Sequence, residues 1–380
     1  MRPLRLLALV QKRLDLAPGQ RYRLEQWAPR LERLHDIRLD FAVFESNELS
    51  ETLYKPGHRA RKAQLIVSDF WRRREILSRA RDYDAVVVYR EAALLGPAIY
   101  ERLLAAMRIP IVVDFDDAIW LAQPSGPNGV FARLRFPGKT ASICRLADAV
   151  TVGNEYLARY ARELCGDVSI VPTTVDLSTY HVAPPIPDEG PFVIVWTGSH
   201  STLAHLEHAR GAIERLGRSR AVRLRVICDR PPARPFANVD NEFVKWQSST
   251  EAADVAAAHV GIMPVPDEPF TRGKCALKGL LYMASGRPAV LSPVGVNADI
   301  VRPWENGVLA TSEDEWHDAL ERLAASPELR RTLGAAGRRT VEEGYSAEQG
   351  AKLFAEVCRR AVSGRARRSR GEGGDARAVP

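Results

Sequence analysis

The sequence predicts an α/β protein with two Rossmann-like domains, each a parallel sheet covered by helices on both faces. Three observations lead to this prediction. The chain has 380 residues, more than one ordinary domain needs. Short apolar segments of strand length alternate with helical segments along most of it. One Pro-rich and aperiodic segment, residues 181–191, separates two such series and predicts an interdomain linker.

The first series predicts an N-terminal domain over residues 1–180. Its expected strands are residues 3–10, 37–44, 84–89, 109–115, 148–153 and 168–173. Its expected helices are residues 23–34, 96–108, 140–147 and 154–165, with a further basic helical region after the second strand. A loop rich in Pro and Gly, residues 123–129, interrupts the series.

The second series predicts a C-terminal domain over residues 192–345. Its expected strands are residues 192–198, 224–229, 244–246, 260–265 and 288–294. Amphipathic helices follow at residues 314–323, 327–343 and 347–362, and the last corresponds to a terminal helix over 346–362. Residues 363–380 contain almost no apolar side chains and predict a disordered basic tail. The carboxyl ends of the two sheets are expected to face a cleft, because open α/β sheets bind ligands at those ends.

Composition fits a soluble protein of the cytoplasm. Hydrophobic residues make up 46% of the chain and charged residues 27%. The longest apolar runs are strand-sized and far from the roughly 20 residues that span a bilayer. The basic and apolar N-terminus lacks a cleavage site, so it predicts a first strand and no signal peptide. Five widely spaced cysteines without a CxxC pair indicate neither zinc nor disulfides and fit a reducing compartment.

The net charge of +7 is concentrated in the tail and between Lys55 and Arg81, where Phe70 and Trp71 interrupt a basic run. Basic runs with aromatic residues suit nucleic acid, anionic lipid or a phosphorylated substrate. An ordinary solvated helix face explains the run equally well. Because no nucleic-acid-binding motif accompanies it, no nucleic-acid partner is expected.

Residues 266–301 carry the most informative pattern, a loop that enters a predicted helix with basic side chains. Arg272, Gly273 and Lys274 stand at the expected helix N-terminus, where free N–H groups and the helix dipole favour an anion. Lys278 follows Lys274 by one helical turn, so both lysines are expected on one face. Two lysines aimed at one point suit a diphosphate. The alternative is that both are merely solvated.

Polar residues also follow two predicted strands of the N-terminal domain. Asp114, Asp116 and Asp117 close the strand over 109–115, where reacting groups of α/β proteins lie. Asp116 and Asp117 are candidates for a general base or for binding hydroxyl groups. Helix capping and Mg²⁺ binding are the alternatives. Gly19 and Arg21 follow the first strand, and Arg21 is a candidate for an anionic group or an ordinary surface arginine.

The segment that begins Lys278-Gly-Leu-Leu-Tyr-Met-Ala-Ser-Gly-Arg-Pro resembles the donor-binding region of GT-B glycosyltransferases of the family-4-like type, the glycosyl transferases group 1. Other pieces agree in order: ADAVTVGNEYLARYA (147–161), VPTTVDLSTY (171–180), VIVWTGS (193–199), WENGVLA (304–310) and GAAGRRTVEEGYS (334–346). The resemblance covers about residues 80–350, and the combination is more specific than any single piece.

The resemblance implies the GT-B fold, with two Rossmann-like domains facing across a cleft. It implies a hexosyltransferase-like enzyme that moves a sugar, with retention, from a nucleotide-diphosphate sugar to a saccharide or lipid-linked acceptor in cell-surface polysaccharide or glycolipid synthesis. It implies no cofactor beyond that co-substrate and no metal. If the acceptor is lipid-linked, the basic run from Lys55 to Arg81 is expected to make peripheral contact with anionic membrane from the cytoplasmic side. The residues expected to bind the donor are Gly198, Ser199, Glu268, Arg272, Gly273, Lys274 and Lys278. In this reading Asp116 and Asp117 are catalytic, and Gly19 and Arg21 contact the acceptor or a phosphate.

The sequence departs from the family pattern at the donor site. The usual pair of glutamates falls at Gly273 and Leu281, and the usual Arg and Lys after the first Gly turn are replaced by residues 199–202. Lys274, Lys278 and Arg272 are the available substitutes. Two alternatives therefore stay open: a non-catalytic nucleotide-sugar-binding protein, and a nucleotide-sugar epimerase, which needs acid and histidine partners around the donor.

Overall fold

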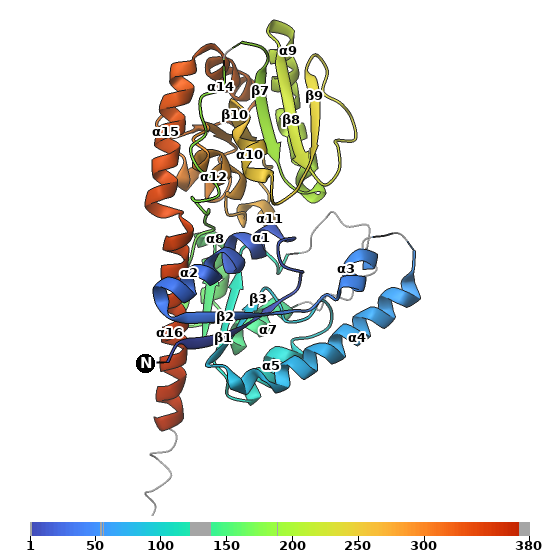
Figure 1. The fold of residues 1–380 in the computed structure, drawn as a ribbon, viewed down its shortest axis with the longest axis vertical. Coiled ribbons are helices and arrows are strands. Elements are labelled where there is room, and N and C mark those ends of the chain that lie inside the picture. The colour runs from blue at the N-terminus through green and yellow to red at the C-terminus, as the bar shows by residue number, and fades with distance from the viewer. Residues whose placement is uncertain (1, 54, 56, 122–137, 188, 372–380) are drawn as a thin grey trace, which may run out of the picture. The chain divides into compact units, whose positions relative to one another are not determined.

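The computed structural model describes residues 2–53, 55, 57–121, 138–187 and 189–371, with the side chains of 366–371 excepted. The chain forms two compact units, each with its own sheet (Figure 1). Unit 1 comprises Met1–Pro172 and Gly350–Pro380, and unit 2 comprises Thr173–Gln349. Each unit contains a six-stranded sheet in which every ladder is parallel. The predicted α/β class with two Rossmann-like domains is thus confirmed.

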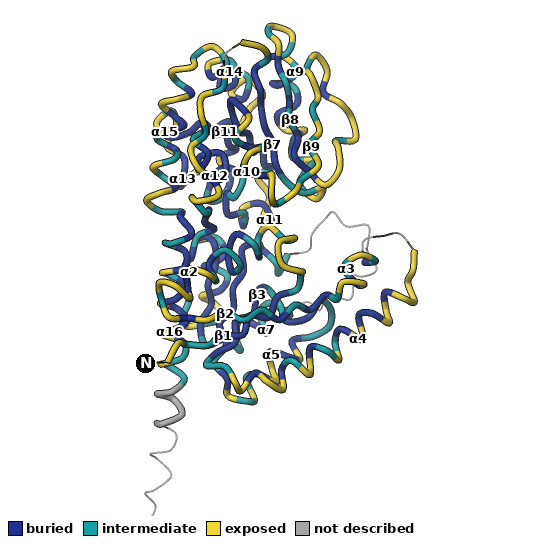
Figure 2. Tube along the Cα trace, viewed as in Figure 1, coloured by how far each residue is buried: buried dark blue, intermediate teal, exposed yellow. Residues whose placement is uncertain are grey.

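The unit 1 sheet has the strand order β2-β1-β3-β4-β5-β6. The strands are β1 Leu4–Val10, β2 Ile37–Val43, β3 Ala85–Tyr89, β4 Ile111–Phe115, β5 Ala149–Val152 and β6 Val168–Ile170. The two central strands β3 and β4 are buried along their whole length, and Figure 2 shows this for β3. Their Val- and Ile-rich runs fit because helices cover both faces of a parallel sheet.

The helices of unit 1 come from both ends of the chain. They are α1 Pro18–Gln20, a π turn η1 Arg21–Glu25, α2 Gln26–His35, α3 Asn47–Leu53, α4 Arg59–Ser78, the 3₁₀ turn η2 Ala80–Asp82, α5 Ile99–Ala106, α7 Lys139–Leu146, α8 Glu155–Arg162 and most of α16 Ala347–Gly371. Phe354 of α16 packs on Trp27, with ring centroids 5.4 Å apart. Arg360 pairs with Asp167 and donates to the Ser169 hydroxyl. The C-terminal helix therefore completes unit 1.

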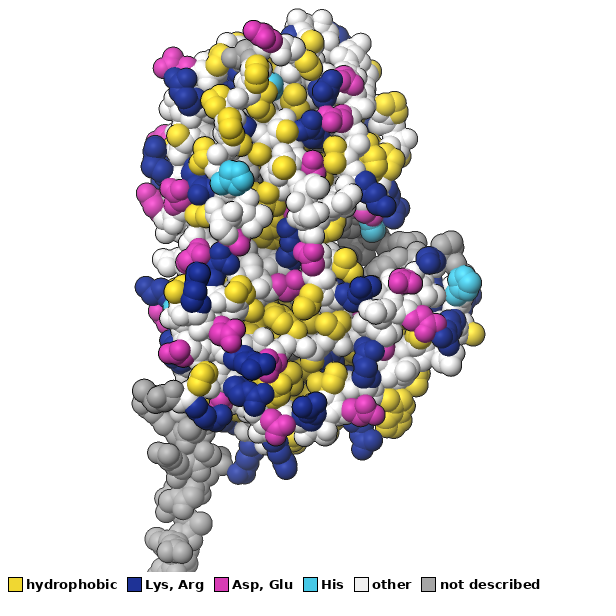
Figure 3. Space-filling view, viewed as in Figure 1, with side chains coloured by type: hydrophobic (Ala, Val, Ile, Leu, Met, Phe, Trp, Pro, Cys, Tyr) yellow, Lys and Arg dark blue, Asp and Glu magenta, His cyan; other side chains and the backbone are white. Residues whose placement is uncertain are grey.

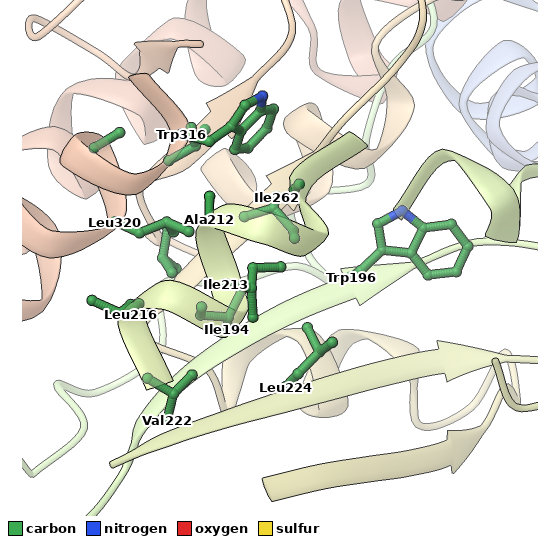
Figure 4. Packing of buried hydrophobic residues seen from close by; sticks show 14 of the residues in the cluster. Ile194, Trp196, Ala212, Ile213, Leu216, Val222, Leu224, Ile262, Trp316 and Leu320 are labelled. Atoms are coloured by element: carbon green, nitrogen blue, oxygen red, sulfur yellow. The ribbon is translucent and has the colours of Figure 1, made fainter. Parts of the chain in front are cut away.

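The unit 2 sheet has the order β12-β11-β10-β7-β8-β9. Its strands are β7 Phe192–Thr197, β8 Val222–Cys228, β9 Asp240–Lys245, β10 Val260–Met263, β11 Ala289–Leu291 and β12 Val308–Leu309. Its helices are the 3₁₀ segment η3 His200–Ala209, α9 Arg210–Ser219, α10 Glu251–Ala256, α11 Pro269–Arg272, α12 Leu277–Ala284, α13 Asn297–Ile300, α14 Glu313–Ala325 and α15 Pro327–Gly344. Ile194, Ile213 and Trp316 belong to the core between this sheet and its helices (Figure 4).

Both sheets reverse their direction of winding next to their first strand. In unit 1 the chain goes from β1 outward to β2 and then resumes at β3 on the other side of β1. In unit 2 it goes from β7 to β8 and β9 and resumes at β10 on the other side of β7. Ligands of open α/β sheets bind at such reversals, beside the carboxyl ends of the strands. The topology therefore marks the carboxyl ends of β1 and β3 and of β7 and β10.

The division of the chain differs from the sequence-based boundaries. Residues 173–180, expected in the N-terminal domain, belong to unit 2, where the Val175 N–H donates to the Tyr345 carbonyl. The expected linker 181–191 is held in unit 2 as well, because Arg287 donates to the Pro184 carbonyl and the Ala183 N–H donates to the Ser285 carbonyl. These hydrogen bonds, invisible in the sequence, move the boundary to Pro172.

Two further expectations concern the C-terminus and the Pro- and Gly-rich loop. Helix α16 continues through residues 363–371, which the sequence placed in a disordered tail, and the rest of that expected tail lies outside the described residues. The loop at 123–129 also lies outside them. Among the helices that are described, none combines the length and apolar character needed to cross a membrane.

A buried ion pair joins the segment after β1 to the centre of the unit 1 sheet. The guanidinium of Arg23, in the π turn, donates two hydrogen bonds to the Asp114 carboxylate at 2.6 and 2.7 Å, and both side chains are fully buried. Arg23 also donates to the Val171 carbonyl, and the Thr151 hydroxyl donates to Asp114. Breaking such a pair by removing one partner typically costs about 3–5 kcal/mol. Asp114, one of the acids in the predicted cluster, is therefore structural.

Candidate functional site

Two acidic residues at the end of β4 share one arginine from the end of β3. The Asp116 Oδ1 atom accepts hydrogen bonds from Arg90 at 2.6 and 3.0 Å and from the Tyr89 hydroxyl at 2.8 Å. The Asp117 Oδ2 atom accepts from Arg90 at 2.6 Å. Arg90 has a positive φ of 63°, in the left-handed region, and its N–H donates to the Asp114 carbonyl. This uncommon backbone conformation occurs where the side chain meets both carboxylates.

The electrostatics of this cluster favour the ionised form of Asp116. Burial acts to raise the pKa of Asp116, but the charges of Arg90 and Arg23 and the hydrogen bonds from Arg90 and Tyr89 outweigh burial and lower it. The pKa of Arg90 lies well above its usual value, because the attraction of Asp116 outweighs burial. Burial raises the pKa of Tyr89. A carboxylate with a lowered pKa is a weak general base and a good acceptor of hydrogen bonds from hydroxyl groups.

Gly19 lies against this cluster, and the other predicted residue of its loop does not. A Cβ atom at position 19 would stand 2.2 Å from both the Asp116 Oδ2 and the Tyr89 Oη atoms, so only glycine allows this approach. Arg21 instead pairs with Asp15 at 3.3 Å and lies over the ring of Tyr22. Of the two, the structure brings Gly19 to the carboxylates.

The alternatives for the acidic cluster can be compared with its contacts. Residues 116–121 form turns rather than the first turn of a helix, so neither carboxylate caps a helix within the described residues. Asp114 is engaged with Arg23, while Asp116 and Asp117 bind Arg90. In the described part of the chain, no group of His, Cys, Asp or Glu has the arrangement of a metal site. The geometry leaves Asp116 and Asp117 as paired acceptors at the end of β4.

In unit 2, Gly198 and Lys278 meet at the end of β7. The Lys278 ammonium lies 5.2 Å from the centroid of the Trp196 ring and 3.5 Å from the Thr202 Oγ1 atom. A Cβ at position 198 would come within 2.6 Å of the Trp196 ring and 2.8 Å of the Lys278 Cε atom. Gly198 therefore provides the space that Lys278 occupies. Lys278 belongs to α12, next to the reversal between β7 and β10.

Lys274 and His205 belong to the same positive region, although Lys274 is not helical. It follows α11 and precedes α12, so the predicted single helix through both lysines is wrong; Ala276, with a φ of 56°, separates the two helices. The Lys274 ammonium lies over the ring of Phe270. Burial, and after it the charges of Lys278 and Lys274, lower the pKa of His205 to about 4. The positive charges of both lysines therefore disfavour protonation of the same imidazole, that of His205.

The remaining predicted donor residues have local partners. Arg272 pairs with Asp267 at 2.6 and 3.0 Å on the surface. Glu268 is the N-cap of α11, in a reciprocal capping box with Thr271, and Gly273 is the C-cap of this helix. The Ser199 hydroxyl hydrogen-bonds that of Ser201 at 2.8 Å. Glu268 therefore has a structural role that its sequence position did not reveal.

The two positions that lack the family's glutamates are buried. Gly273 and Leu281 both face the interior of unit 2. The next residue, Tyr282, donates from its hydroxyl to the Ile262 carbonyl of β10 and accepts from the Thr197 N–H of β7. A tyrosine thus joins the two strands at the reversal of the sheet.

Sequence reasoning missed three residues of these clusters: Tyr89, Arg90 and His205. Tyr89 and Arg90 close a predicted strand, so the rule that selected the aspartates at the end of the next strand would have found them too. His205 carries no signal in the sequence, because only the fold brings it near Lys274 and Lys278.

Replacing Arg90 by Gln should destabilise the protein near neutral pH and much less at acidic pH. A lowered pKa in the folded state stabilises the protein above the usual carboxyl pKa of 3.8, and this stabilisation is lost as the pH falls through the folded value. Without Arg90, burial raises the pKa of Asp116. The native chain should therefore exceed the variant in unfolding free energy near neutral pH by about 1.4 kcal/mol per unit of pKa change.

Urea unfolding from neutral pH to below pH 4 measures this difference, which should shrink at the acidic end. Arg145→Gln, at an exposed arginine, is the control and should show no such pH dependence. A difference between native and Arg90→Gln protein that is constant with pH would contradict the assigned pairing.

Solved structures with the same fold cover nearly the whole chain. Sucrose-phosphate synthase from Thermosynechococcus elongatus superposes with a TM-score of 0.66 at 16% identity, over 96% of this chain and 100% of that one. A glycosyltransferase from Rickettsia africae gives 0.64 at 11% identity, over 95% and 99%. HepE from Anabaena, in complex with UDP-glucose, gives 0.62 at 13% identity, over 93% and 98%. At these identities the likeness shows the fold, which is GT-B.

Sequence comparison adds the family. None of the curated protein sequences matches the chain. The pattern of the family described as "Glycosyl transferases group 1" matches residues 191–326, which include the β7 and β10 strand ends, Gly198 and both lysines. Residues 191–326 thus match the group 1 glycosyl transferases, and this match together with the GT-B fold indicates a glycosyltransferase.

Proposed function

We propose that the chain transfers a sugar from a nucleotide-diphosphate sugar to a saccharide or lipid-linked acceptor. The observation that carries this proposal is the convergence of Lys274, Lys278 and His205 at the carboxyl edge of the unit 2 sheet. Unit 2 holds the donor, and Asp116 and Asp117 of unit 1 bind hydroxyl groups of the acceptor or of the transferred sugar. No cofactor and no metal take part in this proposal, and the product retains the anomeric configuration.

The positive region of unit 2 supports a diphosphate donor. Like charges that lower the pKa of a neighbouring histidine repel one another, and an anion between them relieves that repulsion. Fixed positive charges at the departing diphosphate stabilise the charge that develops in the transition state. HepE, which shares the fold, has been solved with UDP-glucose, which makes a UDP-sugar the first donor to test.

The carboxylates of unit 1 support a positioning role in the transfer. Arg90 favours the ionised form of Asp116 and fixes the direction of both carboxylates through its ion pairs. A carboxylate has two oxygens and about four lone-pair sites, so it can accept hydrogen bonds from several donors, including hydroxyl groups. Holding an acceptor hydroxyl in line with the donor sugar removes much of the entropic cost of the reaction.

Two observations keep the earlier alternatives testable. Leu281 replaces a family glutamate, which favours a protein that binds the donor without turnover. His200 hydrogen-bonds Asp229 at 2.7 Å, at the ends of β7 and β8, and supplies the acid–histidine pair that an epimerase needs. Incubation with each nucleotide sugar separates the three activities: transfer releases nucleotide diphosphate, epimerisation changes the sugar, and binding alone changes neither.

Lys274→Ala and Lys278→Ala should each weaken donor binding. Hydrogen bonds to charged groups contribute about 1.5–3 kcal/mol, which corresponds to roughly a 10- to 150-fold rise in the dissociation constant. A thermal-shift panel of UDP-, GDP- and ADP-sugars identifies the donor, because a ligand at about 100 times its dissociation constant adds about 2.7 kcal/mol of stability. Titration calorimetry with that donor then compares the variants.

Arg302→Ala is the matched control, because Arg302 is exposed and pairs with Glu305 on the surface of the same unit. Donor binding to the native chain should also raise the pKa of His205 above its value of about 4, because the anion offsets the charges of Lys278 and Lys274. Unchanged affinity in both lysine variants would remove the donor assignment.

Asp117→Asn tests the role of unit 1. Asn keeps the shape of the side chain and removes its charge. If Asp117 orients a reacting hydroxyl, turnover with donor and acceptor should fall roughly 100-fold or more, while donor affinity stays unchanged. Equal turnover of native and variant chains would show that the carboxylate only holds Arg90. Asp167→Asn is the control. Asp167 pairs with Arg360 of α16, so this variant should keep full turnover.

Peripheral contact with anionic membrane is part of the proposal, and helix α4 provides its surface. Val67 is 56% exposed and Trp71 60% exposed, and they lie one turn apart with Arg74 over the Trp71 ring. Phe70 packs inward instead, against Phe44 and Tyr100. On the face drawn in Figure 3, basic, acidic and hydrophobic side chains are interspersed over unit 1.

The basic run contributes less surface charge than its sequence indicates. Arg73 is 1% exposed and donates to the carbonyls of Val10 and Ala42, at the ends of β1 and β2. Arg72 pairs with Asp69 and donates to the Phe44 carbonyl. A membrane surface therefore depends on the exposed arginines of α4 and the turn after it.

Trp71→Ala combined with Arg74→Glu should abolish flotation with phosphatidylglycerol-rich vesicles at low salt. Each basic residue near such a surface contributes about 1 kcal/mol, and salt screens this attraction. The native chain should float at low salt and be released at high salt. Arg331→Glu, an exposed position of unit 2, is the control and should float like the native chain. No flotation of the native chain at low salt would contradict the membrane proposal.

A further inference from the structure

A pocket of about 740 Å³ lies in unit 1 at the carboxyl ends of β1 and β2. The side chains that matter for its chemistry are Arg13, Leu14, Glu45, Asn47 and Arg72. They come from the loops after β1 and β2 and from helices α3 and α4. The volume falls within the range of small-molecule sites, and strand ends are where α/β sheets bind ligands.

Glu45 brings a buried and incompletely satisfied carboxylate to this pocket. Its side chain has no exposed surface, and its Oε1 atom accepts from the Lys12 ammonium at 2.5 Å. Its Oε2 atom is buried and has no hydrogen-bond partner among the described residues. Burial raises the pKa of Glu45, which Lys12 only partly opposes. An unmatched buried acceptor is unfavourable, so the carboxylate is suited to a ligand that donates a hydrogen bond.

A second unmatched group stands beside it and has the opposite character. The Gln11 Nε2 atom, a donor, is also buried without a partner among the described residues. The two residues are neighbours across the strand ends, because the Glu45 N–H donates to the Gln11 carbonyl at 3.0 Å. A hydroxyl group both donates and accepts. The residues that line the pocket include Glu45 and not Gln11, so the ligand group required there is a hydroxyl that donates to the Glu45 carboxylate.

We propose that this pocket is a distal acceptor subsite, which binds one hydroxyl-bearing sugar unit of an oligosaccharide. The inference rests on the proposed glycosyl transfer. Adjacent strands are about 4.8 Å apart, and the order β2-β1-β3-β4 places the pocket roughly 10–14 Å from the Asp116 carboxylate along the sheet edge. A single sugar does not cover that span. The acceptor is thus a chain of sugars, with its reacting end near Asp116 and a further unit at Glu45.

The guanidinium groups at the pocket fit the same ligand. Arg13 is exposed and makes no hydrogen bond or ion pair within the described part of the chain. Arg72 is anchored by Asp69 at 3.0 Å and still lines the pocket. Both present N–H donors to the ring and hydroxyl oxygens of a sugar.

Saturation-transfer NMR on the full chain tests the subsite with cellotriose, maltotriose and triacetylchitotriose as probes, and with glucose for comparison. At least one trisaccharide should bind the native chain, and more tightly than glucose. Glu45→Gln should raise its dissociation constant roughly tenfold or more, because the charged acceptor is lost. Glu75→Gln, at an exposed position of α4 that does not line the pocket, should leave binding unchanged.

Asn47→Trp provides a second variant in case Glu45→Gln does not fold. Asn47 is exposed at the start of α3, so a bulky side chain fills the pocket without entering the core, and trisaccharide binding should be lost. No trisaccharide binding to the native chain, or equal binding in both variants, overturns the subsite.

The donor thermal-shift assay on the same samples separates the two proposals. Donor binding without any trisaccharide binding leaves glycosyl transfer in place and removes the subsite. The opposite outcome is trisaccharide binding that depends on Glu45, in a chain that binds no nucleotide sugar. It would confirm a saccharide site at the pocket and contradict the proposed glycosyl transfer.

Discussion

The arrangement of unit 1 depends on the buried ion pair between Arg23 and Asp114. Two charges leave water, and the cost is offset because the guanidinium and carboxylate bind through two parallel hydrogen bonds. Val171 and Thr151 satisfy further hydrogen-bonding groups of the pair. The pair fixes the segment after β1 against β4. This brings Gly19 onto the Asp116 carboxylate, and the charge of Arg23 helps to keep Asp116 ionised.

The two units use the ends of their strands in opposite electrostatic ways. In unit 1, Asp116 and Asp117 form ion pairs with Arg90, so the region offers hydrogen-bond acceptors of fixed direction. In unit 2, the charges of Lys278 and Lys274 add to burial in lowering the pKa of the same residue, His205. A glycine permits the close approach in each case, at positions 19 and 198. The first arrangement suits hydroxyl groups and the second suits an anion.

The basic run from Lys55 to Arg81 shows why charge in a sequence is not charge on a surface. Arg73 donates hydrogen bonds to carbonyl groups at the ends of β1 and β2, and Lys62 donates to the Lys55 carbonyl. Trp71 remains exposed, whereas Phe70 is partly buried against Phe44 and Tyr100. The same strand ends that Arg73 supports form the wall of the Glu45 pocket. Helix α4 therefore connects the outer surface of unit 1 with a candidate ligand site.

The sequence by itself determined the fold class, the order of the elements and the strand ends that carry polar residues. It could do so because strand and helix periodicity are local, and because parallel strands place their carboxyl ends on one edge. Asp116 and Asp117 follow from that rule, whereas Lys278 follows from its spacing to Lys274 and Gly198 from the family resemblance. Only the tertiary structure decided that Arg90 holds the two aspartates, that His205 joins the lysines and that Glu45 lies beside Gln11. It also returned the C-terminal helix to unit 1 and held residues 181–187 in unit 2. These outcomes depend on contacts between residues far apart in the chain, which no local pattern encodes.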